Sequence, residues 1–538
     1  MNAHLSSDET RQQPGDAREA RLAHIVSLHN TGEILEAETL CRQLAEADPH
    51  DHHVVFLLGL IVHRAGRYTE AIQYFLQAID LQPSVAQYYV ALAESLKEQG
   101  SLDDAIDCFH AVLQIDPANA DALNGVGDVF LRRHEYEGAI TAFERAIEID
   151  PDYVEAYGNL GGALARTGRF DRSIEMSRAA LALNDRYLPA FNNLGFVYFR
   201  LKRFDEALDW YARALDVDPN DAYLHFHRSM VLLASGCYAP GWNEFEWRLR
   251  KSDFAALNKR AKTPGMWNGE PLAGRSILVW CEQGFGDTFQ FIRYLPLLRK
   301  QARSVVFECQ REVLSLLAPC ADVERIVARD ETGSDELYGC DCHIPLLSLP
   351  RLFETTLETV PAPMPYIRAT PEAIEKFSAY VSDASLSIGI VWSGGTAFRE
   401  NAIRSCTLAD FLPLINSAPL SSARFFSLQK GEAESQLESL SLHTSITNLG
   451  RLCENFEDTS GALHHMDVVI TVDTSVAHLA GAMGKPVLLC LMHAHDWRWY
   501  ATKEWYPSIR PFVQPVPGDW KSVFEAVAVE LSRLRISL

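Results

Sequence analysis

Apolar residues recur at helical spacings of three and four positions through the first 220 residues of the chain. Segments such as GRYTEAIQYFLQAIDLQP and YEGAITAFERAIEIDP place their aliphatic and aromatic side chains on one side of a helix with 3.6 residues per turn. Prolines follow these segments, and a proline lacks the backbone N–H that a continuing helix needs. This part of the chain is therefore predicted to be helical.

The helical pattern repeats with a period of 34 residues. Prolines and small residues recur in phase, at Pro49, Pro83, Pro117, Pro151 and Pro219 and at Gly59, Ala93, Gly127, Gly161 and Gly195. Small side chains let two helices approach closely, and the proline ends the second helix of each unit. Each repeat is therefore predicted to be a pair of antiparallel helices.

In period and in consensus these units resemble the tetratricopeptide-repeat family. Five clear units are expected, over residues 50–83, 84–117, 118–151, 152–185 and 186–219. A degenerate first unit is expected over 16–49, and a drifting last unit over 220–253. The resemblance implies a concave groove that holds an extended peptide or a partner helix. We expect this part to bind a protein and to carry no catalytic residue.

The repeat pattern fades after residue 235, where Trp242, Phe245 and Trp247 lie at near-helical spacing. We expect these aromatic residues to pack the last repeat onto the next domain. The organisation predicted for the N-terminal half is a flexible tail over 1–15, a solenoid over 16–253 and a polar linker over 254–275.

From Ser276 the pattern changes to short apolar runs that alternate with helical segments. The runs SILVW, SVVFEC, SIGIVW, RFFSLQ, DVVITV and PVLLCL are predicted strands, and YLPLLRK, ADFLPLI, TSVAHLAGAM and SVFEAVAVELSRL are predicted helices. Alternation of this kind is typical of parallel sheets built from βαβ units. Residues 276–370 and 371–538 are each long enough for one Rossmann-like half.

Composition limits the partners and the compartment. A formal net charge of −22 repels phosphate backbones and anionic lipid, so neither nucleic acid nor a membrane surface is expected as a partner. The 11 cysteines are scattered, as in a chain with reduced thiols. Cys340, Cys342 and His343 lack a second ligand pair at zinc-finger spacing, which favours burial in a strand or loop. The N-terminus has no signal-like apolar stretch, so a cytoplasmic protein without stable membrane insertion is expected.

The first candidate motif, ILVWCEQGFGDTFQF, runs from a predicted strand into a helix. Gly284 and Gly286 let backbone N–H groups approach an anion at the start of that helix. A dinucleotide fingerprint would need a third glycine where Phe289 stands, which argues against a dehydrogenase. Asp287 has a second interpretation as a helix cap, which would by itself explain an aspartate here.

The second motif is DVVITVDTSVAHLAGAMGKPV, in which Asp473, Thr474 and Ser475 open a helix that also carries His478. Such small polar residues cap helices, and they also bind sugar hydroxyls or a diphosphate. A third set is basic: Arg399, Arg404 and Lys430 follow predicted strands, at the edge where open α/β sheets bind ligands. In an acidic protein these cations are the patch that a nucleotide diphosphate would need, although each is also compatible with ordinary solvated charge.

Together, GFGDTFQFIRYLPLL, IGIVWSGG and VITVDTSVAHLAGAMGKPV resemble the bacterial heptosyltransferase-like glycosyltransferases in their order, over residues 276–538. The fusion to repeats is similar to bacterial repeat-plus-transferase proteins, including flagellin glycosyltransferases, and more distantly to the O-linked N-acetylglucosamine transferases. The resemblance implies an α-solenoid followed by an α/β GT-B fold, with the nucleotide sugar bound mostly by the C-terminal half.

What the resemblance implies for single residues is a catalytic aspartate at Asp287 and a donor-binding set at Asp473, Thr474, Ser475 and His478. The lysine that the family places after its central strand has no clear match, and Arg399 or Arg404 is the expected replacement. No Asp-X-Asp pair occurs in residues 276–538, so neither a metal nor another cofactor is expected.

The reaction expected is inverting transfer of a sugar from a nucleotide donor to a Ser or Thr hydroxyl of a protein held by the repeats. Asp287 would be the general base, and Arg404, Lys430 and the helix start at Asp473 would offset charge on the leaving diphosphate. Two alternatives stay open. One is a scaffold whose transferase fold is inert, and the other is a lipopolysaccharide or polysaccharide glycosyltransferase.

Overall fold

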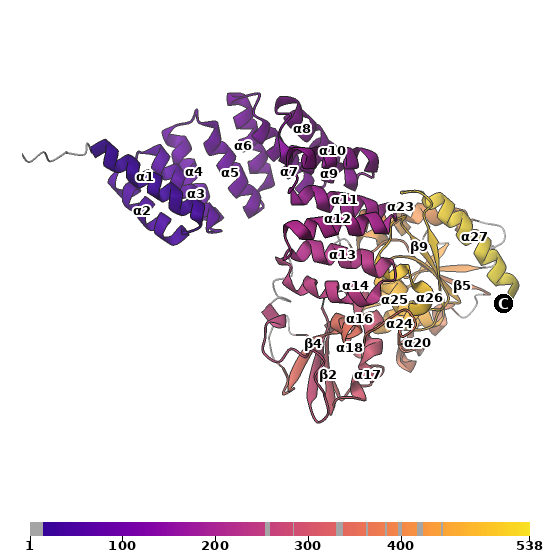
Figure 1. The fold of residues 1–538 in the computed structure, drawn as a ribbon. Coiled ribbons are helices and arrows are strands. Elements are labelled where there is room, and N and C mark those ends of the chain that lie inside the picture. The colour runs from indigo at the N-terminus through magenta and orange to yellow at the C-terminus, as the bar shows by residue number, and fades with distance from the viewer. Residues whose placement is uncertain are drawn as a thin grey trace, which may run out of the picture. The chain divides into compact units, whose positions relative to one another are not determined.

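The computed structural model describes residues 14–252, 259–282, 284–329, 337–361, 364–381, 385–395, 401–416, 423–442 and 445–537. The chain forms two compact units, residues 1–194 and 195–538 (Figure 1). The second unit contains the last repeat helices together with the whole α/β part, and each unit is described by itself below.

The first unit consists of antiparallel helix pairs, as the 34-residue period predicts. Its helices are α1 (Pro14–Thr31), α2 (Ile34–Ala47), α3 (His52–Arg64), α4 (Tyr68–Leu81), α5 (Ala86–Gln99), α6 (Leu102–Ile115), α7 (Ala120–Arg132), α8 (Tyr136–Ile149), α9 (Val154–Arg166), α10 (Phe170–Leu183) and the start of α11 (Leu188–Arg200). Pro83, Pro117 and Pro151 each lie two residues beyond the end of a second helix.

The recurring glycines are needed for close packing within each pair. A Cβ atom on Gly59 would lie 2.5 Å from the Phe75 ring, and a Cβ atom on Gly127 would lie 2.5 Å from the Phe143 ring. Both rings are fully buried. Glycine therefore makes room for the phenylalanine of the second helix, which confirms the expected role of the small residues.

The second unit begins with the end of α11, followed by α12 (Phe204–Val217), α13 (Ala222–Ala234), α14 (Tyr238–Phe245) and the 3₁₀ helix η1 (Glu246–Arg250). Helix α14 is the short partner of α13, as expected for a drifting last repeat. Trp242 and Phe245 are buried, and the Trp242 indole N–H donates to the Thr355 carbonyl over 3.0 Å. These two residues therefore pack the repeat helices onto the α/β part, as predicted.

Two parallel sheets follow. The first has the order β3-β2-β1-β4, with β1 (Ser276–Trp280), β2 (Ser304–Cys309), β3 (Arg325–Ala328) and β4 (Cys342–Pro345). The second has the order β10-β9-β8-β5-β6-β7, with β5 (Ser387–Val391), β6 (Arg424–Ser427), β7 (Ile446–Asn448), β8 (Val468–Val472), β9 (Val487–Leu491) and β10 (Ile509–Val513).

Both sheets reverse their strand order at one point, between β1 and β4 in the first and between β5 and β8 in the second. Open α/β sheets bind ligands at the carboxyl ends of the strands beside such a point. The loops after β1, β5 and β8 carry the sequence motifs, so the topology brings those motifs to the binding edges of the two sheets.

Helices cover both faces of the second sheet. Ile470 and Leu488 pack under α27 (Trp520–Ser537), whereas Val469 and Leu489 belong to the core that also contains helix residues Leu463 and Leu479. The other α-helices of this unit are α16 (Phe285–Phe291), α17 (Leu295–Arg299), α18 (Arg311–Leu317), α19 (Leu349–Leu352), α20 (Pro371–Val381), α21 (Asn401–Arg404), α22 (Leu412–Ile415), α23 (Gln436–Ser439), α24 (Phe456–His464), α25 (Ser475–Ala482) and α26 (Thr502–Trp505).

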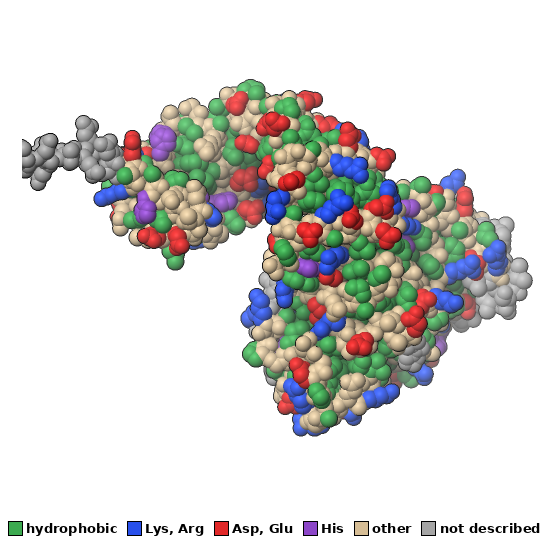
Figure 2. Space-filling view, in the orientation of Figure 1, with side chains coloured by type: hydrophobic (Ala, Val, Ile, Leu, Met, Phe, Trp, Pro, Cys, Tyr) green, Lys and Arg blue, Asp and Glu red, His purple; other side chains and the backbone are tan. Residues whose placement is uncertain are grey.

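Acidic and basic side chains lie interspersed over the face shown in Figure 2. The net charge of −22 is therefore not gathered into one acidic block on that face. Within the described ranges, we find no helix with the length and apolar character needed to cross a bilayer.

Candidate functional site

Asp287 lies in the first turn of α16, where the chain leaves β1. Gly284 is the cap residue of this helix, so the alternative interpretation of Asp287 as the cap is wrong. A Cβ atom on Gly284 would lie 2.9 Å from Asp287 Oδ2, so the carboxylate is folded back over the glycine. The glycine therefore makes room for the carboxylate itself.

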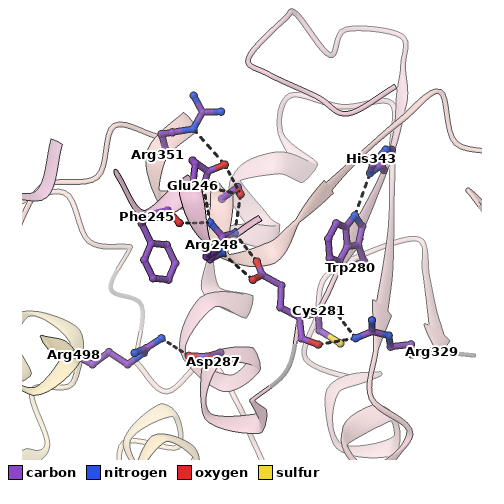
Figure 3. Close-up of polar contacts among 12 residues, drawn as sticks. Phe245, Glu246, Arg248, Trp280, Cys281, Asp287, Arg329, His343, Arg351 and Arg498 are labelled. Atoms are coloured by element: carbon purple, nitrogen blue, oxygen red, sulfur yellow. Dashed lines mark hydrogen bonds and ion pairs between the residues drawn. The ribbon is translucent and has the colours of Figure 1, made fainter. Parts of the chain in front are cut away.

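The other carboxylate oxygen of Asp287 accepts from Arg498 of the second sheet's half. Arg498 Nη2 lies 2.6 Å from Asp287 Oδ1 (Figure 3). Arg498 Nη1 lies 2.9 Å from Asp496 Oδ1. Arg498 belongs to the 3₁₀ helix η9 (Trp497–Trp499), in the loop region after β9. Burial opposes its charge, but the two carboxylates hold the pKa of the Arg498 guanidinium above its usual range.

Helix α25 begins at the second motif, at the carboxyl end of β8. Thr474 is its cap residue by position, yet the Thr474 hydroxyl makes no capping hydrogen bond within the described chain. That hydroxyl lies 3.1 Å from the Thr471 hydroxyl instead. Ser475 is the first residue of the helix and is partly exposed. The start of α25 therefore presents polar groups that the helix does not use to cap itself.

His478 joins the two motifs. A Cβ atom on Gly286 would lie 2.7 Å from His478 Cδ2 and 3.3 Å from Nε2, so α16 and α25 are in close contact at this glycine. His478 Nδ1 lies 3.0 Å from the Tyr506 hydroxyl, and the imidazole packs on the Trp499 ring at 4.5 Å between centroids. Burial lowers the pKa of His478 well below its usual value, and nearby arginines lower it further. The imidazole is therefore neutral at pH 7.

Asp473 is an unusual acid. Enclosure by the protein raises the pKa of Asp473 to about 6, the negative charge of Asp496 adds to the rise, and Arg404 and Arg498 oppose it. A carboxyl with a pKa near neutrality, beside several arginines, is typical of a functional site rather than of a surface ion pair.

Asp473→Asn is expected to stabilise the protein above pH 6. The raised pKa means that the folded state holds a proton more tightly than the unfolded chain, so this carboxyl costs stability as the pH rises from about 4 to about 6. Asparagine avoids that cost. We expect its melting temperature to exceed that of the wild type by about 2 °C at pH 8, with the difference vanishing toward pH 4. Thermal unfolding of both proteins from pH 5 to 8 tests this, and a wild type that is the more stable at pH 8 would contradict it.

Arg404 ends the short helix α21 after β5. A Cβ atom on Gly394 would lie 2.6 Å from Arg404 Nη2, so the guanidinium lies against Gly394 in the loop after β5. Arg404 also affects the pKa of Asp473, which places it at the same site. Arg399, the other candidate for this role, lies outside the described residues.

Gln429 fixes this loop, and the sequence analysis missed it. Its Oε1 accepts from the backbone N–H groups of Trp392 and Ser393 at 3.0 and 2.9 Å, and its Nε2 donates to the Ser393 carbonyl at 3.0 Å. The side chain is 2% exposed. A buried amide that satisfies three backbone groups determines the shape of the loop.

Lys430 follows Gln429 at the end of the β6 loop. Its backbone carbonyl accepts from Gln429 Nε2 over 2.8 Å, and its ammonium donates to the carbonyl of Cys453. The residue is exposed. The structure thus places Lys430 at the carboxyl edge of the second sheet with its ammonium on a backbone carbonyl, and brings it to none of the motif residues.

Glu282 anchors the loop that leads to Asp287. Arg248 of η1 binds both of its oxygens, Nε to Oε2 at 2.8 Å and Nη2 to Oε1 at 2.6 Å (Figure 3). Arg329 donates to the Glu282 carbonyl over 2.6 Å. Arg248 and Glu282 are both buried. The end of the repeats therefore holds the first motif through a buried ion pair.

The remaining candidates are structural. Cys342 is buried in β4, and His343 accepts from the Trp280 indole at 3.2 Å and lies 3.2 Å from the Thr263 carbonyl, as expected for burial in a strand. Across the described ranges no three His, Cys, Asp or Glu side chains are placed to hold a metal ion. A surface hollow of about 600 Å³ on the first repeats is lined by Glu38, Arg42 and Arg67. Both arginines form ion pairs with Glu38. We therefore take the motif residues of the α/β part as the candidate site.

The structure brings Gly284, Gly286, Asp287 and His478 together where α16 contacts α25. Asp473, Thr474 and Ser475 lie at the start of α25, and the charge of Arg404 acts on Asp473. The sequence analysis missed Arg498, Asp496 and Gln429. Arg498 lies just beyond β9, in the segment HAHDWRWY. The rule that singled out Arg404 and Lys430, a cation in the loop after a strand, therefore also applies to Arg498.

Comparison with known proteins identifies the repeats. Tetratricopeptide-repeat family models match residues 22–86, 86–119 and 152–220, and a further TPR-repeat model matches 127–168. Protein FlbA of Caulobacter vibrioides is 25% identical over 341 residues, which cover 58% of this chain and 56% of FlbA. The chain therefore spans little more than half the length of that relative.

Solved structures resemble the helical part. The Cut9–Hcn1 hetero-tetramer of the APC/C is 20% identical, with 44% of this chain and 48% of that chain covered and a TM-score of 0.39. A tetratricopeptide-repeat protein from Parabacteroides merdae is 17% identical, with 45% and 96% covered and a TM-score of 0.39. TTC0263 of Thermus thermophilus is 23% identical, with 34% and 99% covered and a TM-score of 0.31. The family models, and not these structures, show that tetratricopeptide repeats are present, and such repeats suggest a protein-interaction scaffold.

Proposed function

We propose that this protein is a glycosyltransferase of the GT-B type that moves a sugar from a nucleotide-sugar donor to a Ser or Thr hydroxyl of a protein bound by the repeats. The observation that carries the proposal is the contact between α16 and α25, which sets Asp287 against Arg498 and the start of α25. These groups come from the binding edges of two parallel sheets, where open α/β folds place their ligands.

The donor would bind at the start of α25. Backbone N–H groups at a helix start, the hydroxyls of Thr474 and Ser475, which do not cap the helix, and two guanidinium groups suit a diphosphate. Arg404 and Arg498 supply the positive charge that the overall charge of −22 does not. Lys430, expected among the donor contacts, is left out of this part of the proposal because its ammonium binds the Cys453 carbonyl.

The chemistry needs a base and a stabilised leaving group. Asp287 would take the proton of the acceptor hydroxyl as its oxygen attacks the anomeric carbon, and the bond from that carbon to the diphosphate oxygen would break. The leaving diphosphate keeps the electron pair, and the guanidinium groups offset its charge. Attack opposite to the leaving group inverts the anomeric carbon. His478, neutral and buried, would contribute shape and hydrogen bonding rather than charge.

The test is calorimetric binding of UDP, GDP, ADP and CMP and of their sugars to the full chain. Asp473→Ala with Arg404→Ala is the test variant, and Lys521→Ala, which removes an 87% exposed cation of α27, is the matched control. We expect one nucleotide to bind saturably, to lose affinity in the test variant and to keep it in the control. Absence of binding to the well-folded wild type would favour an inert transferase fold on a repeat scaffold.

A further inference from the structure

Arg498 is the cation nearest to the proposed base, Asp287. The two terminal nitrogens of its guanidinium, Nη1 and Nη2, have different partners. The backbone N–H of Arg498 and its Nη1 both donate to Asp496 Oδ1, at 3.0 and 2.9 Å, so Nη1 is fixed within its own loop. Its Nη2 reaches across to Asp287 of the other half. The Nε atom is buried and lacks a hydrogen-bond partner among the described residues. The guanidinium is therefore anchored to Asp496 through Nη1 and bound to Asp287 through Nη2, while its Nε–H is unused.

The ion pair with Arg498 engages one oxygen of the Asp287 carboxylate. Oδ1 is held by Arg498, and Oδ2 lies over Gly284. A general base needs an oxygen within about 2.6–3.2 Å of the hydroxyl whose proton it takes. Opening of the ion pair, or a turn of the carboxylate, frees Oδ1 for this role.

A diphosphate is a stronger partner for this guanidinium than Asp287. It carries more negative charge than one carboxylate, and a guanidinium binds phosphate oxygens through paired donors. Arg293, a buried arginine near His478, is already committed, since it donates to the carbonyls of Pro361 and Trp505 and to the Tyr366 hydroxyl. Arg498, in contrast, donates to the proposed base, Asp287.

We propose that Arg498 exchanges partners during the reaction: its Nη2 holds Asp287 in the empty protein and moves to the donor diphosphate when that binds, which releases the Asp287 carboxylate to face the acceptor. This inference rests on the proposed function. Asp496 keeps Nη1 in place, so the exchange needs only a rotation near the end of one side chain.

The exchange sets the order of events. The donor binds first and removes Arg498 from Asp287, and the acceptor hydroxyl then loses its proton to Asp287 while its oxygen displaces the diphosphate. When the nucleoside diphosphate leaves, Asp287 passes the proton to water and the pair with Arg498 forms again. One oxygen of the base is thus kept occupied until a donor is present.

The experiment is a double-mutant cycle on the full chain, with Asp287→Asn and Arg498→Gln singly and together. The probes are UDP, GDP, ADP and inorganic pyrophosphate, and their affinities are measured by calorimetry. Because Asp287 competes with the diphosphate for Arg498, Asp287→Asn should tighten binding about 5- to 10-fold in the wild-type background. In the Arg498→Gln background the same change should alter affinity by less than about 2-fold.

The results separate the exchange from simpler explanations. Equal tightening in both backgrounds would mean that Asp287 only repels the ligand, and weaker binding by Asp287→Asn would mean that it holds the ligand. Either result overturns the exchange while the glycosyltransferase proposal stands. Failure of the wild type to bind any of the four probes overturns both. If Arg498→Gln does not fold, Arg498→Lys replaces it in the cycle, because lysine keeps the charge and lacks the second terminal nitrogen.

Discussion

Asp287→Asn should lower the rate of sugar transfer by about 10²- to 10⁴-fold, the range typical of a lost general base. Asparagine has nearly the shape of aspartate but cannot take a proton. Its amide can still occupy the space over Gly284, so the loop between β1 and α16 should keep its form. The measurement is the initial rate with the nucleotide sugar that the binding experiment selects, at saturating donor.

Asp496→Asn is the matched control for this change. It removes a carboxylate from the same guanidinium, Arg498, but from a residue with no place in the proton transfer. We expect its rate to fall by less than about tenfold, since it affects only the placement of the cation. Donor binding should not weaken in Asp287→Asn. Turnover close to that of the wild type in Asp287→Asn would remove this residue from the mechanism.

Strands with continuous apolar runs were predictable from the sequence. SILVW and PVLLCL correspond to β1 and β9, and every residue of these two strands is buried. Helices cover both faces of such strands, so each side chain must be apolar, and the run is visible without any other information. The 34-residue repeat was predictable for a related reason, because each unit buries the same positions as its neighbours.

The four strands that the sequence analysis missed, β3, β4, β7 and β10, are the outer strands of the two sheets. Arg325–Ala328 and Ile509–Val513 form the outer strands β3 and β10, where one side of the strand has no neighbour and several side chains are exposed. Mixed polarity removes the apolar run that identifies a buried strand. The strand β4, Cys342–Pro345, is buried but only four residues long, which is too short for periodicity to show.

The candidate site divides along similar lines. Asp287 and the Asp473–His478 set follow directly from the strand–helix junctions that carry them, so local pattern was enough. The strand-end rule could have singled out Arg498 as a cation, but not its pairing with Asp287, which lies 211 positions away in the chain. That Asp287 faces the other half likewise depends on this distant partner.

The same dependence on distant residues joins the repeats to the site. Glu282, two residues before Gly284, is held by Arg248, which also donates to Glu246 at 2.8 Å and to Ser348 at 2.9 Å. On another side, the Trp505 indole donates to the Tyr238 hydroxyl of α14 over 2.8 Å. The loop that carries Asp287 is thus tied to η1, and Trp497, beside Arg498, packs on Trp242 of α14 at 5.3 Å between ring centroids. The end of the repeats therefore contributes to the geometry of the site.

Arg248→Met should destabilise the second unit by about 3–5 kcal/mol, the cost of leaving one partner of a buried ion pair without the other. Glu282 is 6% exposed and would keep its charge without the guanidinium that binds both of its oxygens. Methionine fills much of the space of the arginine stem, so lost packing contributes little. Chemical denaturation followed by tryptophan fluorescence and thermal unfolding both measure the loss.

The double variant Arg248→Met with Glu282→Gln tests why Arg248→Met loses stability. If the cost comes from a buried charge without a partner, neutral glutamine should restore about half of the stability that Arg248→Met removes. Equal stability of the single and double variants would instead assign the loss to the contacts of Arg248 with Glu246 and Ser348. In that case Arg248 would still hold the end of the repeats to the α/β part. The loop of Asp287 would not depend on the ion pair between Arg248 and Glu282, so Arg248 would support the fold rather than the site.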